Sequence, residues 1–411
     1  MFQNFLSAAS PHQAHHRVAA LRHLLTQHHL DGVIVPLSDE YQNEYIPEDA
    51  ARLSWLTGFT GSAGAAVILQ QQAFLFTDGR YTIQIRQETD GSIFSYYNVQ
   101  ETSLTQFLSQ YAAPLRLGFD PMLHPVLEVE KLEHAIKKNG GELIATPENL
   151  VDKIWLDRPA PKNAAIFLQP IQFAGCSAQE KIQHVQAQLQ QQQIATFILT
   201  DPSCIAWLFN IRGSDVVHNP LPLCFCLMRA EHPPKIFIHP KKLTEATQRY
   251  LGQQADVLHP EEFLQQIALF AQTEEVIALD ASKTPYKIAQ IIKKQGGGYQ
   301  LMADPITRLK AIKNSVECEG ARRAQHRDNL AMIRFLAWLQ QQQPHSISEI
   351  CAAKKLEDIR QQTAKELGFE LKEISFDTIA GSGGNSAIIH YRVSEKTNRQ
   401  LQKGEVFLID S

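Results

Sequence analysis

Hydrophobic and polar residues alternate along the first part of the chain in a way that predicts strands separated by helices. Residues 13–30 repeat apolar side chains at the spacing of one helix face, and residues 32–36 form a short apolar run typical of a buried strand. Further strands are expected near 65–69, 74–81, 116–119 and 142–145, and further helices near 103–113 and 127–138. Strands that alternate with helices indicate an α/β domain, which we expect to span residues 1–160.

A second stretch of the chain repeats the pattern of the first. Residues 54–62 and 206–214 keep Trp, Leu, Gly and Ser in the same register, 152 residues apart. Each stretch also follows a helix and an apolar strand, so the shared order of elements favours duplication over chance identity. We therefore predict a second α/β domain over residues 161–303 with the fold of the first.

The duplication has geometric consequences. Trp55 should superpose on Trp207, and Gly61 on Gly213. Glycine tolerates a positive φ and a close backbone approach because it has no Cβ, so each glycine is expected at one or the other. Two domains with different strand orders would contradict the duplication.

Residues 304–411 change in pattern and predict a third, α+β unit. Two long helices are expected first, each opened by a capping box in which an Asn or Ser and a Glu three residues later satisfy free backbone amides. The expected pairs are Asn314 with Glu317 and Ser346 with Glu349. Short apolar runs at 375–379, 387–391 and 406–409 then predict three consecutive strands of one sheet.

Two of these strands end on side chains that can carry chemistry, His390 and Asp410. Side chains at the ends of consecutive strands can converge on one cleft, and carboxylate oxygens are suitable ligands for divalent cations. Each residue also has a purely structural explanation, because a buried histidine can bond a backbone carbonyl and an aspartate often begins a turn. From the residues alone, the pair predicts no more than a candidate metal site.

Two other motifs receive structural interpretations. The glycine-rich segment 380–385 lacks the Lys-Ser or Lys-Thr pair and the following helix of a phosphate-binding loop, so we expect a flexible turn between strands. His12, His15 and His16 have the spacing of a metal clamp, but no carboxylate or cysteine joins them. A solvated helix start is the better interpretation of these histidines.

Composition narrows the class of protein. The chain has 411 residues, of which 44% are hydrophobic and 20% charged, and its formal net charge is −4. Neither nucleic acid nor membrane is expected as a partner, because there is no basic surface excess and no apolar run of about 20 residues. The start lacks the pattern of a signal peptide, and the six cysteines do not form metal or disulfide motifs. We therefore expect a cytoplasmic protein with reduced thiols.

A long series of ordered motifs carries a family resemblance. They lie at 38–46, 58–64, 77–81 (Thr-Asp-Gly-Arg-Tyr), 149–159, 205–220, 388–391 (Ile-Ile-His-Tyr) and 404–411 (Gly-Glu-Val-Phe-Leu-Ile-Asp-Ser). From about residue 12 to its end, the chain resembles the cytosolic three-domain Xaa-Pro aminopeptidases (aminopeptidase P). The resemblance implies a mixed α/β and α+β fold, with two creatinase-type N-terminal domains in tandem and the first part of a pita-bread metallopeptidase domain over 304–411.

The resemblance also implies an activity and its site residues. Members of the family release the N-terminal residue from short peptides with proline in second position, usually with two manganese ions. His390 matches the histidine that lines the substrate site and helps to hold or protonate the reacting groups, and Asp410 matches the first metal-ligating aspartate. Arg52, just before the 58–64 motif, is a candidate for substrate binding, with a surface salt bridge as the equal alternative.

Further implications concern the rest of the site and the assembly. The family's remaining metal ligands are a second aspartate, a histidine and two glutamates, and they would all lie beyond Ser411. We therefore expect the catalytic domain to be cut within this chain, which alone should be inactive and bind metal weakly. The full-length protein is expected to form a homodimer.

Two alternatives remain open beside the Xaa-Pro aminopeptidase. One keeps the fold as a non-catalytic pita-bread module that binds peptides or proteins. The other is a prolidase or creatinase activity on the same class of fold. The duplicated N-terminal region and the Ile-Ile-His-Tyr segment favour the aminopeptidase over the second alternative, while the retained Asp410 argues against the first.

Overall fold

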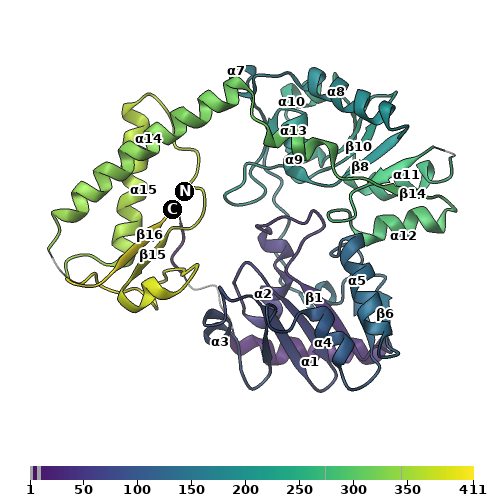
Figure 1. The fold of residues 1–411 in the computed structure, drawn as a ribbon, viewed down its shortest axis with the longest axis horizontal. Helices are drawn as coiled ribbons and strands as arrows, with labels where there is room; N and C mark the ends of the chain where they lie inside the picture. The colour runs from purple at the N-terminus through teal and green to yellow at the C-terminus, as the bar shows by residue number, and fades with distance from the viewer. Residues whose placement is uncertain (1–2, 7–10, 274, 344) are drawn as a thin grey trace.

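The computed structural model describes residues 3–6, 11–273, 275–343 and 345–411. Figure 1 shows two sheet-containing domains, one above the other, with a third part made of two long helices and a β-hairpin beside them. Within the described residues, no helix is both long enough and apolar enough to cross a membrane.

The first domain is built on a six-stranded sheet in the order β4-β3-β2-β1-β5-β6. Its strands are β1 (Gly32–Pro36), β2 (Ala65–Leu69), β3 (Ala73–Thr77), β4 (Ser95–Asn98), β5 (Arg116–Phe119) and β6 (Glu142–Ala145). Its helices are α1 (Pro11–Gln27), α2 (Arg52–Thr57), α3 (Gln84–Glu88), α4 (Leu104–Gln110), α5 (Val126–Lys137) and α6 (Leu150–Ile154). The apolar stripe of α1 packs into the core, where Val18, Leu21 and Leu25 are almost completely buried, as the helical spacing predicted.

The second domain contains another six-stranded sheet, in the order β12-β11-β10-β8-β13-β14. Its strands are β8 (Thr196–Leu199), β10 (Phe225–Arg229), β11 (Lys235–Phe237), β12 (Asp256–Leu258), β13 (Ile277–Leu279) and β14 (Tyr299–Leu301), with a small pair β7 (Phe167–Leu168) and β9 (Ile211–Arg212). Its helices are α7 (Ile171–Ala174), α8 (Ala178–Gln191), α9 (Pro202–Leu208), α10 (Glu245–Gly252), α11 (Phe263–Phe270), α12 (Tyr286–Lys294) and α13 (Pro305–Ala311).

The two sheets have the same topology. When β8 is placed on β1, the strand orders coincide position by position. The pairs β1·β2, β2·β3, β8·β10 and β10·β11 are antiparallel, and every other pair in both sheets is parallel. This agreement is what the predicted duplication requires, while the domain boundaries themselves stay a prediction.

A repeated side-chain contact supports the same conclusion. In the first domain, Arg17 on α1 donates to the carbonyl oxygen of Trp55 and lies 4.3 Å from the centre of its ring. In the second, Lys181 on α8 donates to the carbonyl oxygen of Trp207 at 2.9 Å and lies 4.1 Å from that ring centre. A cation above the face of an indole is attracted by the ring's quadrupole, so each domain ties the long helix before its sheet, α1 or α8, to the motif helix in the same way.

The two motif glycines lie at close approaches, as expected. A Cβ on Gly61 would come within 2.9 Å of Cδ1 of Tyr81, and one on Gly213 within 2.8 Å of the backbone nitrogen of Pro222. Real Cβ atoms do not tolerate such distances to backbone or rigid ring atoms. Each glycine is therefore required by packing rather than by a positive φ.

Lys181 gives a testable pH dependence. Its ammonium group is buried against Trp207 and Asn210, and burial lowers the pKa of Lys181 from 10.5 to about 8. Between these two pH values the unfolded chain binds the extra proton and the folded chain does not, so this group makes stability rise with pH. We expect the free energy of unfolding of wild type minus that of Lys181→Met to rise from pH 8 to 10, with a slope of at most about 1.4 kcal/mol per pH unit. If the free energies of unfolding of the two proteins changed equally with pH across this range, the assignment would be contradicted.

The third part begins with α14 (Ser315–Gln340) and α15 (Glu349–Glu366). The predicted capping box of α14 is present, because the Asn314 side chain accepts from backbone amides and Glu317 bonds back to the Asn314 amide. The second predicted capping box is wrong. Ser348, not Ser346, caps α15, because the Glu349 carboxylate is turned inward and accepts bonds from the chain around residues 382–399.

The hairpin that follows differs from the expected three strands. β15 (Ile379–Ser382) pairs antiparallel with β16 (Phe407–Asp410), so Gly381, the first glycine of the supposed turn, belongs to a strand. Residues 387–391 are not a strand; the short helix η4 (Gly383–Ala387) leads into a turn in which His390 has a φ of 55°. A left-handed residue cannot continue an extended strand. Of the apolar run, Ile388 packs on the cluster that contains Tyr391, whereas Ile389 is 61% exposed.

The first described residues belong to the third part rather than to the first domain. The Gln3 side chain bonds the backbone of Thr378 in both directions, and the carbonyl of Phe5 accepts from the amide of Glu395 at 3.0 Å. Phe5 is buried with Ala380, Tyr391 and Val393. These contacts fasten residues 3–5 to the segment that carries His390 and Tyr391.

Candidate functional site

A cavity of about 470 Å³ lies where all three parts of the chain meet. It is lined by Tyr45, Thr60, Gly61, Ser62, Tyr81 and Gln84 of the first domain, Val217 and His218 of the second, and Phe376, Asp377, Ile379, His390, Tyr391, Arg392 and Asp410 of the third. The two residues predicted from the ends of the C-terminal runs, His390 and Asp410, are thus brought to one cavity. Both side chains are exposed and available to a ligand.

His390 is connected to the first domain by a short chain of hydrogen bonds. Its Nδ1 lies 3.0 Å from the hydroxyl of Tyr81, and that hydroxyl lies 2.6 Å from Oγ of Ser62. The Tyr81 and His390 rings are nearly perpendicular, with centroids 5.8 Å apart. The unfavourable left-handed backbone of His390 is therefore compensated by contacts that fix the direction of its ring.

A second histidine enters the cavity from the second domain. His218 has a φ of 62° and lies in the loop between β9 and β10. Its Nδ1 lies 3.1 Å from the carbonyl oxygen of Ile374, and its Nε2 lies 3.4 Å from Oδ1 of Asp377. Arg392 lies 2.8 Å from the other oxygen of Asp377, so a cation from each side faces this carboxylate when His218 is protonated.

Asp410 is the last residue of β16 and pairs with Ile379 of β15. Within the part of the chain that the structure describes, its carboxylate has no hydrogen bond and no ion pair. An exposed carboxylate beside a cavity is the donor type that divalent cations of the manganese and magnesium class prefer. Asp410 therefore fits the role of one metal ligand.

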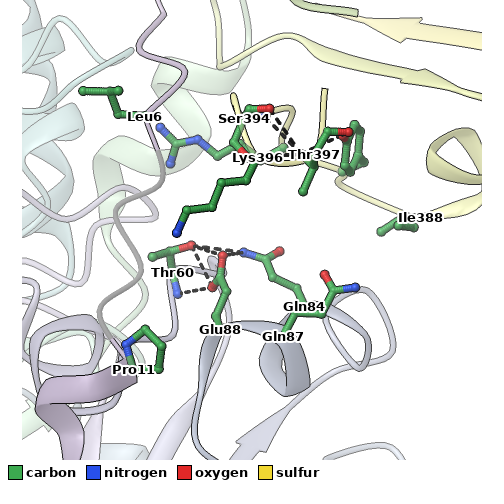
Figure 2. Close-up of a pocket in the computed structure, with 12 residues that line it drawn as sticks. Leu6, Pro11, Thr60, Gln84, Gln87, Glu88, Ile388, Ser394, Lys396 and Thr397 are labelled. Carbon is green, nitrogen blue, oxygen red and sulfur yellow. Dashed lines mark hydrogen bonds between the residues drawn. The ribbon is translucent and has the colours of Figure 1, made fainter. Parts of the chain in front are cut away.

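A smaller neighbouring cavity of about 190 Å³ lies between the first domain and the third part. Figure 2 shows Glu88 receiving hydrogen bonds from Thr60 and Gln84 on one side, with the Lys396 side chain extending toward them from the other. Burial raises the pKa of Glu88. The two cavities share Thr60, Gln84, Tyr391 and Arg392, so they adjoin each other along the boundary, and we call the two together the recess.

The structure does not bring Arg52 to either cavity. Its side chain turns into the first domain, where Nε and Nη2 bond the two oxygens of Asp152 at 2.7 and 3.0 Å and Glu40 lies 3.8 Å away. Arg52 is only 3% exposed. The salt-bridge alternative therefore matches the position of Arg52, but the bridge is buried and not on the surface.

Among the described residues, one group of potential metal ligands lies elsewhere, in the second domain. Asp201, Cys204 and Asp304 place ligand atoms within 4.8 Å of one another. A lysine already occupies this group, because Nζ of Lys283 lies 2.5 Å from Oδ2 of Asp201. Burial raises the pKa of the Cys204 thiol, which disfavours the thiolate that a metal would need. The group is therefore built around a partly buried ion pair that joins the N-cap of α9 to Lys283 in the segment after β13.

Sequence reasoning missed several residues of the cavity. Tyr81 closes the 77–81 motif and His218 directly precedes the Asn-Pro end of the 205–220 motif, so both lay within or beside segments already singled out. Their positions in or beside these motifs could have marked them as candidate site residues. Asp377 and Arg392 gave none, because single charged residues within or beside a short predicted strand are ordinary surface features.

The chain matches three family descriptions in order. Residues 17–154 and residues 157–317 each match a creatinase/prolidase N-terminal domain, and residues 319–411 match metallopeptidase family M24. The three matched regions follow the same order as the two sheets and the helical third part of the structure.

Relatives resemble almost the whole chain. It is 32% identical to the probable Xaa-Pro aminopeptidase P of Coccidioides posadasii over 99% of the chain, and 33% identical to that of Ajellomyces dermatitidis over 96%. The chain spans 64% and 66% of the lengths of these two relatives.

A solved structure shares the arrangement of all three parts. The X-prolyl aminopeptidase of Caenorhabditis elegans, described as a cytosolic enzyme with a di-nuclear active site, superposes with a TM-score of 0.89 at 26% identity. The match covers 97% of this chain and 67% of the nematode chain. The chain therefore carries two creatinase/prolidase N-terminal domains in tandem, followed by a segment of the metallopeptidase M24 domain.

Proposed function

We propose that this chain belongs to a metal-dependent aminopeptidase that releases the N-terminal residue from peptides with proline in second position. The observation that carries the proposal is the three-part cavity, in which His390 and Asp410 meet residues of both N-terminal domains. The arrangement resembles that of an X-prolyl aminopeptidase over nearly the whole chain. The names of the curated relatives point to the same reaction.

The proposed cofactor is a pair of divalent cations, with Mn²⁺ as the expected metal. When bound, such cations polarise the peptide carbonyl and supply hydroxide at neutral pH. Asp410 would hold one of them through its exposed carboxylate. His390 would bind the reacting carbonyl region of the peptide, and the recess beside it would receive the residues that follow proline.

The assembly and location are also proposals. A homodimer of the full-length protein and a cytoplasmic location follow from the family resemblance, and the nematode enzyme is described as cytosolic. Short peptides with proline in second position would be the partners of the site. Arg52 is not proposed as a substrate ligand, because Asp152 and Glu40 already surround its guanidinium group.

The proposal predicts a specific substrate and metal dependence. Among the described residues, only Asp410 and His390 belong to the expected ligand and substrate set, whereas a site of this kind needs about four to six metal ligands. We expect the 411-residue chain alone to bind Mn²⁺ weakly and to hydrolyse nothing. If the reading frame continues past codon 411, its whole product should cleave an Xaa-Pro tripeptide, lose activity to a chelator and regain it with Mn²⁺.

Two controls separate the alternatives. A matched peptide with alanine in second position should be a poor substrate, and an Xaa-Pro dipeptide tests for prolidase activity. Cleavage of the dipeptide alone would replace the aminopeptidase by a prolidase. A downstream sequence without the expected aspartate, histidine and glutamates would leave a peptide-binding module.

A further inference from the structure

We infer that the first domain sets the tautomer of His390, with Tyr81 donating its hydroxyl proton to Nδ1 so that Nε2 carries the hydrogen. The catalytic use of that N–H rests on the proposed function; the tautomer itself does not. A residue of the creatinase-type domain thereby becomes a positioning residue for a histidine of the M24 segment.

Tyr81 is held rigidly enough to act in this way. It is 3% exposed, and its ring packs edge to face against Phe59 with centroids 5.9 Å apart. The guanidinium of Arg80 lies 5.1 Å from the ring centre, and Gly61 leaves the space that a Cβ would take from the ring. The phenol oxygen therefore has a fixed position, 3.0 Å from Nδ1 of His390.

The direction of the hydrogen bonds follows from the groups involved. Each hydroxyl has one proton to donate, whereas a neutral imidazole has one donor nitrogen and one acceptor nitrogen. An unprotonated imidazole nitrogen is a stronger acceptor than a phenol oxygen. The order Ser62 to Tyr81 to Nδ1 uses both hydroxyl protons within the chain of bonds, at 2.6 and 3.0 Å. The reverse order would leave the Ser62 proton without a partner in this chain of bonds.

This direction decides what His390 can do. Within the described residues Nε2 has no hydrogen-bond partner, so its N–H is free to meet an acceptor in the cavity. His390 then acts as a donor to the carbonyl oxygen of a bound peptide and not as the base that takes a proton from water. A donor aimed at the oxygen where negative charge develops is an effective stabilising group.

Nitrogen NMR on the 411-residue chain tests the inference without any catalysis. Long-range proton–nitrogen correlation on histidine-labelled protein, at mildly alkaline pH where free imidazole is neutral, reports which ring nitrogen is protonated. The His390→Gln variant identifies the resonance. We expect an unprotonated Nδ1 and a protonated Nε2 in wild type. In Tyr81→Phe the ratio of the two tautomers should fall about fivefold, because one hydrogen bond is lost.

Two further variants complete the test. Ser62→Ala should shift the ratio in the same direction and less, and it leaves the Tyr81 ring in place if Tyr81→Phe disturbs the fold. Tyr45→Phe is the matched control, because Tyr45 lines the same cavity but packs on His218. A protonated Nδ1 in wild type, or a ratio unchanged in Tyr81→Phe, would overturn the inference. Neither result would contradict the proposed peptide hydrolysis, which is tested separately by the peptide assay.

Discussion

Lys242→Met is expected to destabilise the second domain by about 3–5 kcal/mol, because it leaves a buried aspartate without its cation. Lys242 and Asp215 have side chains only 6% and 1% exposed, and Nζ lies 2.6 Å from Oδ2 of Asp215. The same oxygen accepts a hydrogen bond from the amide of Leu223, while Oδ1 has no partner among the described residues. A carboxylate in this position depends on the lysine for compensation. Differential scanning calorimetry should show a melting temperature lower by roughly 10 °C.

Two matched variants isolate the effect. Lys241→Met makes the same chemical change at the adjacent exposed residue and should stay within about 0.5 kcal/mol of wild type. The double variant Lys242→Met with Asp215→Asn removes both charges and should recover a large part of the loss. A double variant as unstable as Lys242→Met alone would show that packing, and not the unpaired charge, dominates.

The same pair links stability to the cavity. Asp215 anchors the loop from β9 to β10 through its contacts with Leu221 and Leu223, and that loop presents His218. Loss of the anchor should therefore loosen His218 before the sheet itself melts. The histidine NMR spectrum of Lys242→Met, recorded below its melting temperature, would show this as broadening of the His218 signal.

Glu349→Ala is expected to cost roughly 2–5 kcal/mol, since it removes the acceptor of several buried donors. The carboxylate of Glu349 is fully buried and accepts from the amides of Ser382 and Arg399 at 2.7 and 2.9 Å. It also receives bonds from the Asn385 side chain and the Tyr391 hydroxyl. Chemical denaturation measures the loss, and faster amide exchange at Ser382 and Arg399 should accompany it.

Asp358→Ala on the exposed side of the same helix is the matched control and should have little effect. Glu349→Gln keeps one acceptor oxygen and should fall between wild type and Glu349→Ala. Unchanged exchange at both amides in Glu349→Ala would contradict the proposed role. Because Glu349 holds the residues on both sides of His390, the alanine variant should also disturb the His390 ring signal.

The sequence was sufficient to predict those structural features that depend on interactions between residues close together in the chain. The spacing of apolar residues on α1 produced its buried face, and Asn314 with Glu317 marked the start of α14. The repeated Trp and Gly positions implied two domains of one topology, which the two sheets have. In each case the interaction joins residues a few positions apart, or repeats a local unit, so the chain itself displays the pattern.

The sequence misled where a distant partner changes a local preference. Ser346 and Glu349 have the spacing of a capping box, but Glu349 gains more by turning inward to amides 33 and 50 residues away. Residues 387–391 look like a strand, but the buried hydroxyl of Tyr391 bonds Glu349 and a left-handed His390 ends the extended path. Burial of several hydrogen-bonding groups together outweighs a weak local propensity.

The sequence by itself determined the order of the domains and pointed to His390 and Asp410 as the candidate site residues. Only the tertiary structure decided which residues surround the cavity. Tyr81 lies 309 positions from His390 and His218 lies 156 positions from Ile374, yet each pair is within hydrogen-bond distance. No periodicity encodes such contacts, because they arise where separately folded domains pack and their loops meet. The tertiary structure likewise placed Arg52 in a buried ion pair, where Asp152 compensates the charge that burial would otherwise penalise.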